Sequence, residues 1–212
     1  MNRKGWNALK AVLGLVMFGG LLLLVQWYYF AASPLTQQEV DRYIKTIESQ
    51  TQIPGARHDL KALRHFLETD DGRPFYTVNL YQFYDQARYL SQESDGQQPT
   101  IRGSEAYDRF SQIMLRLFVR NAAHPVFNTR WVDAETSNWD RMVIVRYRSR
   151  RDIANLFASE EFAEASTHKW AALEKHERLL VQGRQIPELL VLSIALFLLL
   201  VLISIPVFRK KV

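Results

Sequence analysis

Two long uncharged segments constrain this chain more than any other feature of its sequence. Residues 11–30 and residues 189–208 are each twenty positions long and contain no charged side chain. Twenty apolar residues, at ~1.5 Å of rise each in a helix, cross the ~30 Å hydrocarbon core of a bilayer. The sequence therefore predicts two transmembrane helices, over residues 11–30 and 187–208.

A cleaved signal peptide is the alternative for the first segment, since basic residues precede it. Its apolar run, however, is longer than the ~7–15 residues typical of a signal core. Four aromatic residues close the segment: Trp27, Tyr28, Tyr29 and Phe30. Such a cluster is typical of the aromatic belt at a membrane interface, so we expect an uncleaved anchor.

Basic residues flank the outer ends of both segments. They are Arg3, Lys4, Lys10, Arg209, Lys210 and Lys211. By the positive-inside rule, residues 1–10 and 209–212 are cytoplasmic and residues 31–186 are extracytoplasmic. We therefore expect a two-pass protein of the cytoplasmic membrane. In a bacterium with two membranes this is an inner-membrane protein with a periplasmic domain.

The net charge of +5 comes from the chain ends, because their six basic residues and Glu188 leave residues 31–186 neutral. A neutral domain that faces outward argues against nucleic acid as a partner, despite a pI near 9.5. The chain has no cysteine, which excludes disulfides, thiol nucleophiles and cysteine-bound metals. The expected partners are membrane lipids and either a second copy of the chain or the subunits of a membrane complex.

Residues 31–72 are predicted to form a helical lead-in to a domain over residues 73–186. Thr36 and Glu39 have the spacing of a capping box, and Ser104 and Ser149 are further expected caps. Periodicity and turn residues predict strands at 74–83, 125–133, 141–147 and 178–186, and helices at 37–50, 60–67, 103–121 and 150–178, the last with a break near Ser159. After the lead-in, the order is strand, helix, strand, strand, helix, strand. The predicted fold class is therefore α+β, with a ferredoxin-like domain.

Three stretches of the predicted domain resemble a known group of proteins. They are "VNLYQF" (78–83), "GSEAYDRF" (103–110) and "WDRMVIVRYRSRRDI" (139–153). They resemble small dimeric α+β-barrel domains allied to the antibiotic-biosynthesis monooxygenase and NIPSNAP-like superfamily. The resemblance covers about residues 73–186, and it implies that two ferredoxin-like sheets close into a barrel across the axis of a homodimer. Function is diverse in this superfamily, so the fold does not determine it.

The third stretch is rich in arginine, and strand alternation separates its side chains. Val143, Val145 and Tyr147 are expected on one face, with Arg146 on the other. Ser149 with Asp152 has the chemistry of a helix start. Three arginines surround that start: Arg148, Arg150 and Arg151. We interpret them as solvated surface charges, with lipid phosphates or acids of a partner as the alternative.

Candidate site residues come mainly from the resemblance. In heme-degrading members of the superfamily, an Asn on the first strand and a His on the last helix flank the heme. Asn79 and His168 are the candidates for those places, with Tyr147 as a third working group. The alternative for Asn79 is a hydrogen bond to backbone. Trp139 and Arg146 are candidate ligand-binding residues, although the catalytic Trp of these enzymes has no clear counterpart here.

Established catalytic motifs are missing from the sequence, including G-x-S-x-G, H-E-x-x-H and phosphate loops. Glu161, Glu164 and His168 are spaced along one helix, but the pattern is more typical of an exposed ion pair than of a metal site. We predict neither a metal nor a cofactor, with heme as the alternative. The sequence thus favours a membrane-anchored binding or accessory module over the alternative, a small-molecule enzyme that uses the barrel cavity.

Overall fold

The structure is a computed structural model that divides into two compact units. One unit comprises Met1–Phe30 with Arg184–Val212, and the other comprises Ala31–Gly183. The residues described are 3–29, 33–90, 101–130, 132, 138–183, 193–194, 196–198 and 200–201.

In the first unit, helix α1 (Arg3–Tyr29) contains the first predicted span. Its residues Val12–Tyr29 are long and apolar enough to cross a membrane, and no other described helix meets that test. Most of the second predicted span lies outside the described residues, and the positions that are described there are helical. Phe197 from this segment stacks on Phe18 of α1, with ring centroids 4.9 Å apart. The two apolar segments therefore touch at this point.

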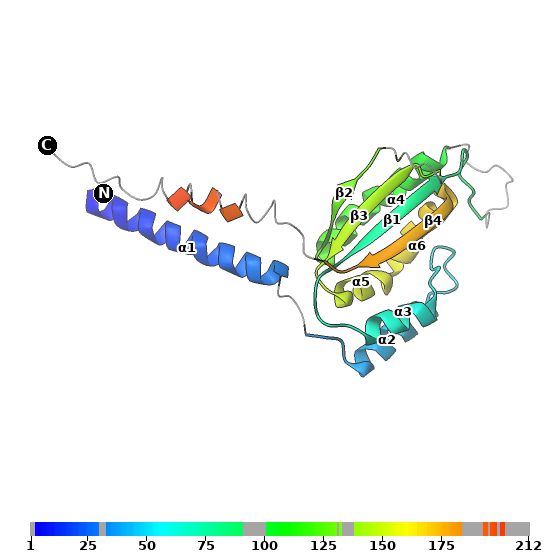
Figure 1. The fold of residues 1–212 in the computed structure, drawn as a ribbon, viewed down its shortest axis with the longest axis horizontal. Helices are drawn as coiled ribbons and strands as arrows, with labels where there is room; N and C mark the ends of the chain where they lie inside the picture. The colour runs from blue at the N-terminus through cyan, green and yellow to red at the C-terminus, as the bar shows by residue number, and fades with distance from the viewer. Residues whose placement is uncertain are drawn as a thin grey trace. The chain divides into compact units, whose positions relative to one another are not determined.

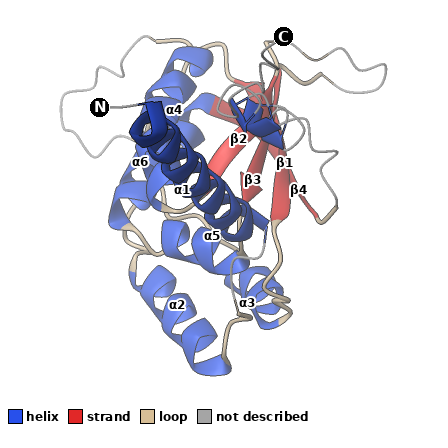
Figure 2. Cartoon of the chain, turned by 90° about the vertical axis from the view of Figure 1, so that its left-hand side faces the viewer, coloured by secondary structure: helices blue, strands red, loops and turns tan. Residues whose placement is uncertain are grey.

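The second unit is built on a four-stranded antiparallel sheet, β1 (Phe75–Phe83), β2 (Ala123–Asn128), β3 (Arg141–Tyr147) and β4 (Leu173–Val181) (Figure 1). The strands lie in the order β2-β3-β1-β4. Three helices connect them: α4 (Gly103–Arg120), α5 (Arg150–Phe157) and α6 (Glu160–Ala172). Helices α4 and α6 lie on one side of the sheet (Figure 2). The α+β class predicted from the sequence is confirmed.

Helices α2 (Gln37–Ser49) and α3 (Leu60–Glu68) precede the sheet. The predicted capping box is present, since the Thr36 side chain accepts from the Glu39 N–H and the Glu39 carboxylate accepts from the Thr36 N–H. The loop after α2 packs tightly on α6, because a Cβ at Gly55 would lie 1.8 Å from the Ala163 carbonyl oxygen. Trp170 Nε1 also donates to the Gly55 carbonyl at 3.1 Å. The lead-in is therefore part of the same compact unit as the sheet, not a separate segment.

Several predicted ends are wrong. The last helix ends at Ala172, and β4 then occupies residues 173–181, where the sequence predicted a helix to 178. Strand β2 ends at Asn128, short of the predicted end at 133. Ser104 caps no helix, since Arg102 is the N-cap of α4 and makes no side-chain cap bond. The break near Ser159 is confirmed, and Ser159 caps α6 by accepting from the Phe162 N–H.

Candidate functional site

A cavity of about 430 Å³ lies between the sheet and the helices that cover it. Alternate residues of β1 and β3 form one wall: Thr77, Asn79, Tyr81, Val143, Val145 and Tyr147. Helix α4 forms much of the opposite wall, and α5 and α6 contribute aromatic side chains. Cavities of roughly 300–1,000 Å³ with mainly apolar walls are typical of small-molecule sites. The predicted shared face of Val143, Val145 and Tyr147 is confirmed.

Asn79 is the best-connected polar side chain at this cavity. Its Nδ2 donates to Thr77 Oγ1 at 2.9 Å and to the Val143 carbonyl at 3.2 Å. Its Oδ1 accepts from Arg178 Nε at 3.3 Å and lies 3.4 Å from His176 Nε2. The backbone bond weighed as an alternative role is therefore present, but Asn79 also positions two side chains of β4.

Lys169 of α6 reaches the cavity from the helix side and is only 3% exposed. Its Nζ lies 4.7 Å from the ring centroid of Trp170 and 5.9 Å from that of Tyr81. No ion pair involves Lys169 among the described residues. Burial, and then the positive charge of Arg178, hold the pKa of Lys169 well below its usual value. Burying a lysine without a counter-charge costs folding free energy, so its presence here indicates a role other than packing.

The surroundings of Lys169 are positive. Burial lowers the pKa of His176 to about 2, with Lys169 and Arg178 as further causes. Burial lowers the pKa of His58 to about 4, again with contributions from Arg178 and Lys169. Among the described residues that line the cavity, the acid is Asp108, whose side chain is 59% exposed and lies 3.3 Å from Arg141. The described acids at the cavity therefore do not balance Lys169 and Arg178 when both side chains are protonated.

Three tyrosines complete the polar lining of the cavity. Burial raises the pKa values of Tyr81 and Tyr147 well above their usual value, and it raises that of Tyr107 to about 12. Their hydroxyl groups therefore stay protonated and can donate hydrogen bonds. The lining thus offers hydroxyl, amide, ammonium and guanidinium donors, which suit a ligand that bears oxygen atoms.

The structure brings two of the predicted site residues to the cavity and leaves the others outside it. Asn79 and Tyr147 line it. His168 does not, because its Nδ1 lies 2.8 Å from the Tyr89 hydroxyl on another side of α6. Asn79 and His168, the pair that the resemblance implies as flanking residues, therefore do not line a common cavity in the described structure.

The two candidate ligand-binding residues also lie away from the cavity. Arg146 is 1% exposed and lies on the opposite face of β3 from Tyr147, as strand alternation requires. Trp139 is buried beneath Lys175, whose Nζ is 4.3 Å from the ring centroid, and it lines a separate pocket near Arg141.

The three arginines around the start of α5 are partly buried and paired with acids, so the interpretation as solvated surface charges is wrong. Arg148 pairs with Asp152 at 3.2 Å, and Arg151 pairs with Glu39, with 3.1 Å from Nη2 to Oε2. Arg150 is 14% exposed and lies 3.9 Å from Asp70. The acids that pair with these arginines all belong to this chain. Contacts with lipid or with a partner at these positions stay untested predictions.

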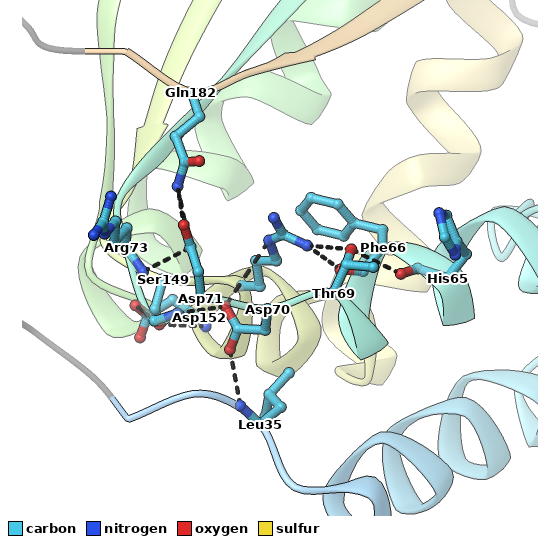
Figure 3. A network of polar contacts seen from close by, with 12 residues as sticks. Leu35, His65, Phe66, Thr69, Asp70, Asp71, Arg73, Ser149, Asp152 and Gln182 are labelled. Atoms are coloured by element: carbon cyan, nitrogen blue, oxygen red, sulfur yellow. Dashed lines mark hydrogen bonds and ion pairs between the residues drawn. The ribbon is translucent and has the colours of Figure 1, made fainter.

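Arg150 joins α5 to the lead-in through a polar network with Phe66, Thr69 and Asp70, which Figure 3 labels. Its Nη1 donates to Thr69 Oγ1 at 2.7 Å and to the Phe66 carbonyl. Asp70, beside it, accepts from the Leu35 N–H at 3.0 Å. The next residue, Asp71, accepts from Gln182 Nε2 at 3.0 Å. Adjacent aspartates therefore hold both the first and the last part of this compact unit.

Metal binding finds no support in the described part of the chain, where no group of three or more His, Asp or Glu side chains is placed to hold an ion. Glu161, one of the acids near His168 in the sequence, pairs instead with Arg120 at 2.7 Å. The spacing of Glu161, Glu164 and His168 therefore does not build a joint site.

Sequence reasoning missed Lys169, His176 and Arg178. A signal for Lys169 was available, because Phe162, Ser166 and Lys169 recur on one face of a helix. His176 and Arg178 alternate along β4, but the sequence interpretation placed His176 in a helix and Arg178 at the boundary between that helix and a strand over 178–186. Only the pairing of β4 with β1 sets Arg178 opposite Asn79.

Comparison with known proteins supports the fold and leaves the function open. No family model matches this chain, and no curated protein does. A solved protein of unknown function from Rhodopseudomonas palustris, RPA0582, is similar in structure, with a TM-score of 0.53. It is 19% identical, over 61% of this chain and 96% of that chain. Its methylated form gives a TM-score of 0.52 at 19% identity. At this identity the likeness shows the fold alone.

Proposed function

We propose that this chain is a membrane-anchored, extracytoplasmic module that binds a small molecule in the cavity beneath its sheet. The observation that carries the proposal is the aromatic-walled cavity of about 430 Å³ into which Asn79, Lys169 and Arg178 project. A purely structural core would fill this space with apolar side chains, since protein interiors are closely packed. It would also not contain an unpaired buried lysine, which destabilises the fold. A ligand site explains both the space and the lysine.

The membrane anchor rests on the chain ends. Apolar side chains of α1 are exposed, including Leu15 at 71% and Leu23 at 70%. A bilayer would cover them, and the basic residues before α1 favour a cytoplasmic N-terminus. The segment over 187–208 provides the second span in this proposal. Both ends of the chain are then cytoplasmic, and the sheet domain lies outside.

The cysteine-free chain offers a direct test of this topology. Lys61→Cys lies on the exposed side of α3 and should react with a membrane-impermeant maleimide in intact cells. Asn2→Cys should react only after the cells are lysed. The reverse pattern, or recovery of the protein in the soluble fraction, contradicts the anchor.

We further propose a ferredoxin-like domain that dimerises through the outer side of the sheet, the side that α4 and α6 do not cover. The support is the strand order together with the apolar residues there, which are Val78, Leu80, Met142, Ile144 and Leu179. Leu179 is 47% exposed, and apolar strand faces of this kind are typically covered. Native mass spectrometry should show a dimer that Leu179→Lys converts to a monomer. Val119→Lys, which replaces an 82% exposed residue on α4, is the matched control and should leave the dimer intact.

A second candidate is an enzyme that acts in the same cavity, and the presence of Asn79 and Tyr147 in its lining favours it. The residues do not fit heme, since no histidine lines the cavity and His168 is bound to Tyr89 outside it. Binding is therefore better supported than a heme-dependent reaction.

Uptake of a neutral aromatic probe tests the binding function. Full-length protein in nanodiscs should bind 2-naphthamide above the level of empty nanodiscs. Ser111→Phe, on the α4 wall, fills part of the cavity and should weaken this binding about tenfold or more, roughly the loss expected when apolar contact of this size is blocked. Val119→Phe, exposed on the same helix, should not change it. A wild-type protein that takes up no probe contradicts the function.

A further inference from the structure

We infer that the ligand of this cavity is a small, mainly apolar acid whose carboxylate is bound between Lys169 and Arg178. This inference rests on the proposed binding function and names the chemistry of the ligand. Three features of the cavity support it: the two basic side chains, the apolar walls and the neutral donors beside them.

The first cation, Lys169, distinguishes this site from an ordinary core. Lysine is almost never fully buried unless it is paired, and Lys169 is 3% exposed. The aromatic faces of Trp170, Tyr81 and Phe110 lie 4.7, 5.9 and 6.0 Å from its Nζ and stabilise a cation only partly. A bound carboxylate supplies the charge that is missing.

The second cation, Arg178, enters from the opposite layer. It lies on β4, lines the same cavity, and is held by its Nε bond to Asn79 Oδ1 at 3.3 Å. Asn79 is in turn fixed by its bonds to Thr77 and Val143. A guanidinium fixed in this way presents a fork of N–H donors, the geometry that suits a carboxylate.

The walls of the cavity select the rest of the ligand. They carry Phe110, Phe118, Phe157, Phe162, Met114 and Leu115. Walls of this kind favour an aromatic or aliphatic body without further charges. The protonated hydroxyls of Tyr81 and Tyr107 can donate to ligand oxygens and, because they are neutral, do not repel an acid. A cationic ligand would meet two positive charges and be excluded.

A pair of isosteric probes tests the inference on the full-length protein in nanodiscs. We expect 2-naphthoate to bind at least tenfold more tightly than 2-naphthamide, which has the same ring system without the charge. Lys169→Met should remove most of this preference, and Arg178→Gln should reduce it. Lys175→Met, an exposed position of β4 outside the cavity lining, is the matched control and should keep it.

Each other result has a distinct meaning. Equal binding of the two probes by the wild-type protein overturns the carboxylate site and leaves the binding cavity standing. Tighter binding of 2-naphthyl phosphate than of 2-naphthoate overturns the carboxylate in favour of a phosphate. Loss of preference in Lys175→Met as well as in Lys169→Met overturns the assignment to Lys169. Binding of neither probe overturns the cavity function and the inference together.

Discussion

Two groups of cations in the sheet domain have opposite surroundings. The arginines at the start of α5 each face an acid, and the Asp70 side chain beside Arg150 is only 1% exposed. Lys169 and Arg178, at the cavity, face aromatic rings and the Asn79 amide, with no acid in ion-pair contact among the described residues. Paired cations of this kind join parts of the fold, whereas unpaired ones destabilise it unless a ligand completes them. The contrast therefore distinguishes the arginines that stabilise the fold from Lys169 and Arg178, the basic residues of the proposed site.

The largest effect is expected from Arg150→Met. This change removes the donor to Thr69 and Phe66 and leaves the buried Asp70 carboxylate without its cation. Breaking one side of a buried pair typically costs ~3–5 kcal/mol, and the long 3.9 Å contact to Asp70 suggests about 3 kcal/mol here. Urea denaturation of the full-length protein in mild detergent measures the loss. Arg116→Met, at a 68% exposed position, should cost less than ~0.5 kcal/mol, and an equal loss would remove the distinction.

The second largest effect is the loss of stability at low pH, when buried His58 must take up a proton near Arg178 and Lys169. The pKa of His58 in the folded protein is about 4, below its unfolded value of about 6.5, mainly because of burial. Between these values the unfolded chain binds more protons, so stability falls as the pH is lowered from about 6.5 to about 4. His58→Phe should reduce this loss by ~2 kcal/mol, measured as the difference in unfolding free energy between pH 7 and pH 4. His65→Phe, exposed on α3, should keep the wild-type loss, and identical curves for His58→Phe and wild type would contradict the explanation.

Lys169→Met tests the unpaired group of the comparison, the basic residues at the cavity. Replacing an unpaired buried cation by an apolar side chain of similar length should stabilise the domain, by ~1–2 kcal/mol. The same variant should lose its preference for 2-naphthoate. A thermal unfolding curve beside that of Lys175→Met measures the gain. A clear loss of stability in Lys169→Met alone would mean that the lysine supports the fold.

The smallest effect belongs to the partly buried pair of Arg151 and Glu39. The hydrogen bond from Arg151, and then the bond from the Thr36 backbone, lower the pKa of Glu39 to about 2. This pair contributes stability above about pH 4.5, and the contribution is lost as the pH falls towards 2. Glu39→Gln should therefore be slightly less stable than wild type at pH 7 and equal to it at pH 2. A difference that persists at pH 2 would place the effect in the capping box instead.

The sequence predicts the paired region better than the cavity. The caps at Thr36 and Ser149 depend on residues three positions apart, so local spacing was enough to find them. The arginines around Ser149 were wrongly interpreted as solvated, because an acid that pairs with one of them can lie far away in sequence, as Glu39 does from Arg151.

Strand β4 shows why the cavity was harder to predict. Its helix-facing positions include His176 and Arg178, and its other face carries Glu177, so both faces look polar. The alternation that identifies a strand disappears when the inward side chains serve a site instead of a core. Lys169, on helix α6, was overlooked because a single lysine among alanines resembles an exposed helix face.

Native mass spectrometry of the protein extracted from its own membranes tests the central claim most directly. The wild-type protein should carry a small molecule that, on release, ionises as an acid and contains a mainly apolar skeleton. The Lys169→Met variant, prepared in the same way, should be empty, and Lys175→Met should be loaded. A wild-type protein that carries a neutral or cationic molecule, or one that stays empty and fails to bind 2-naphthoate, would contradict the account.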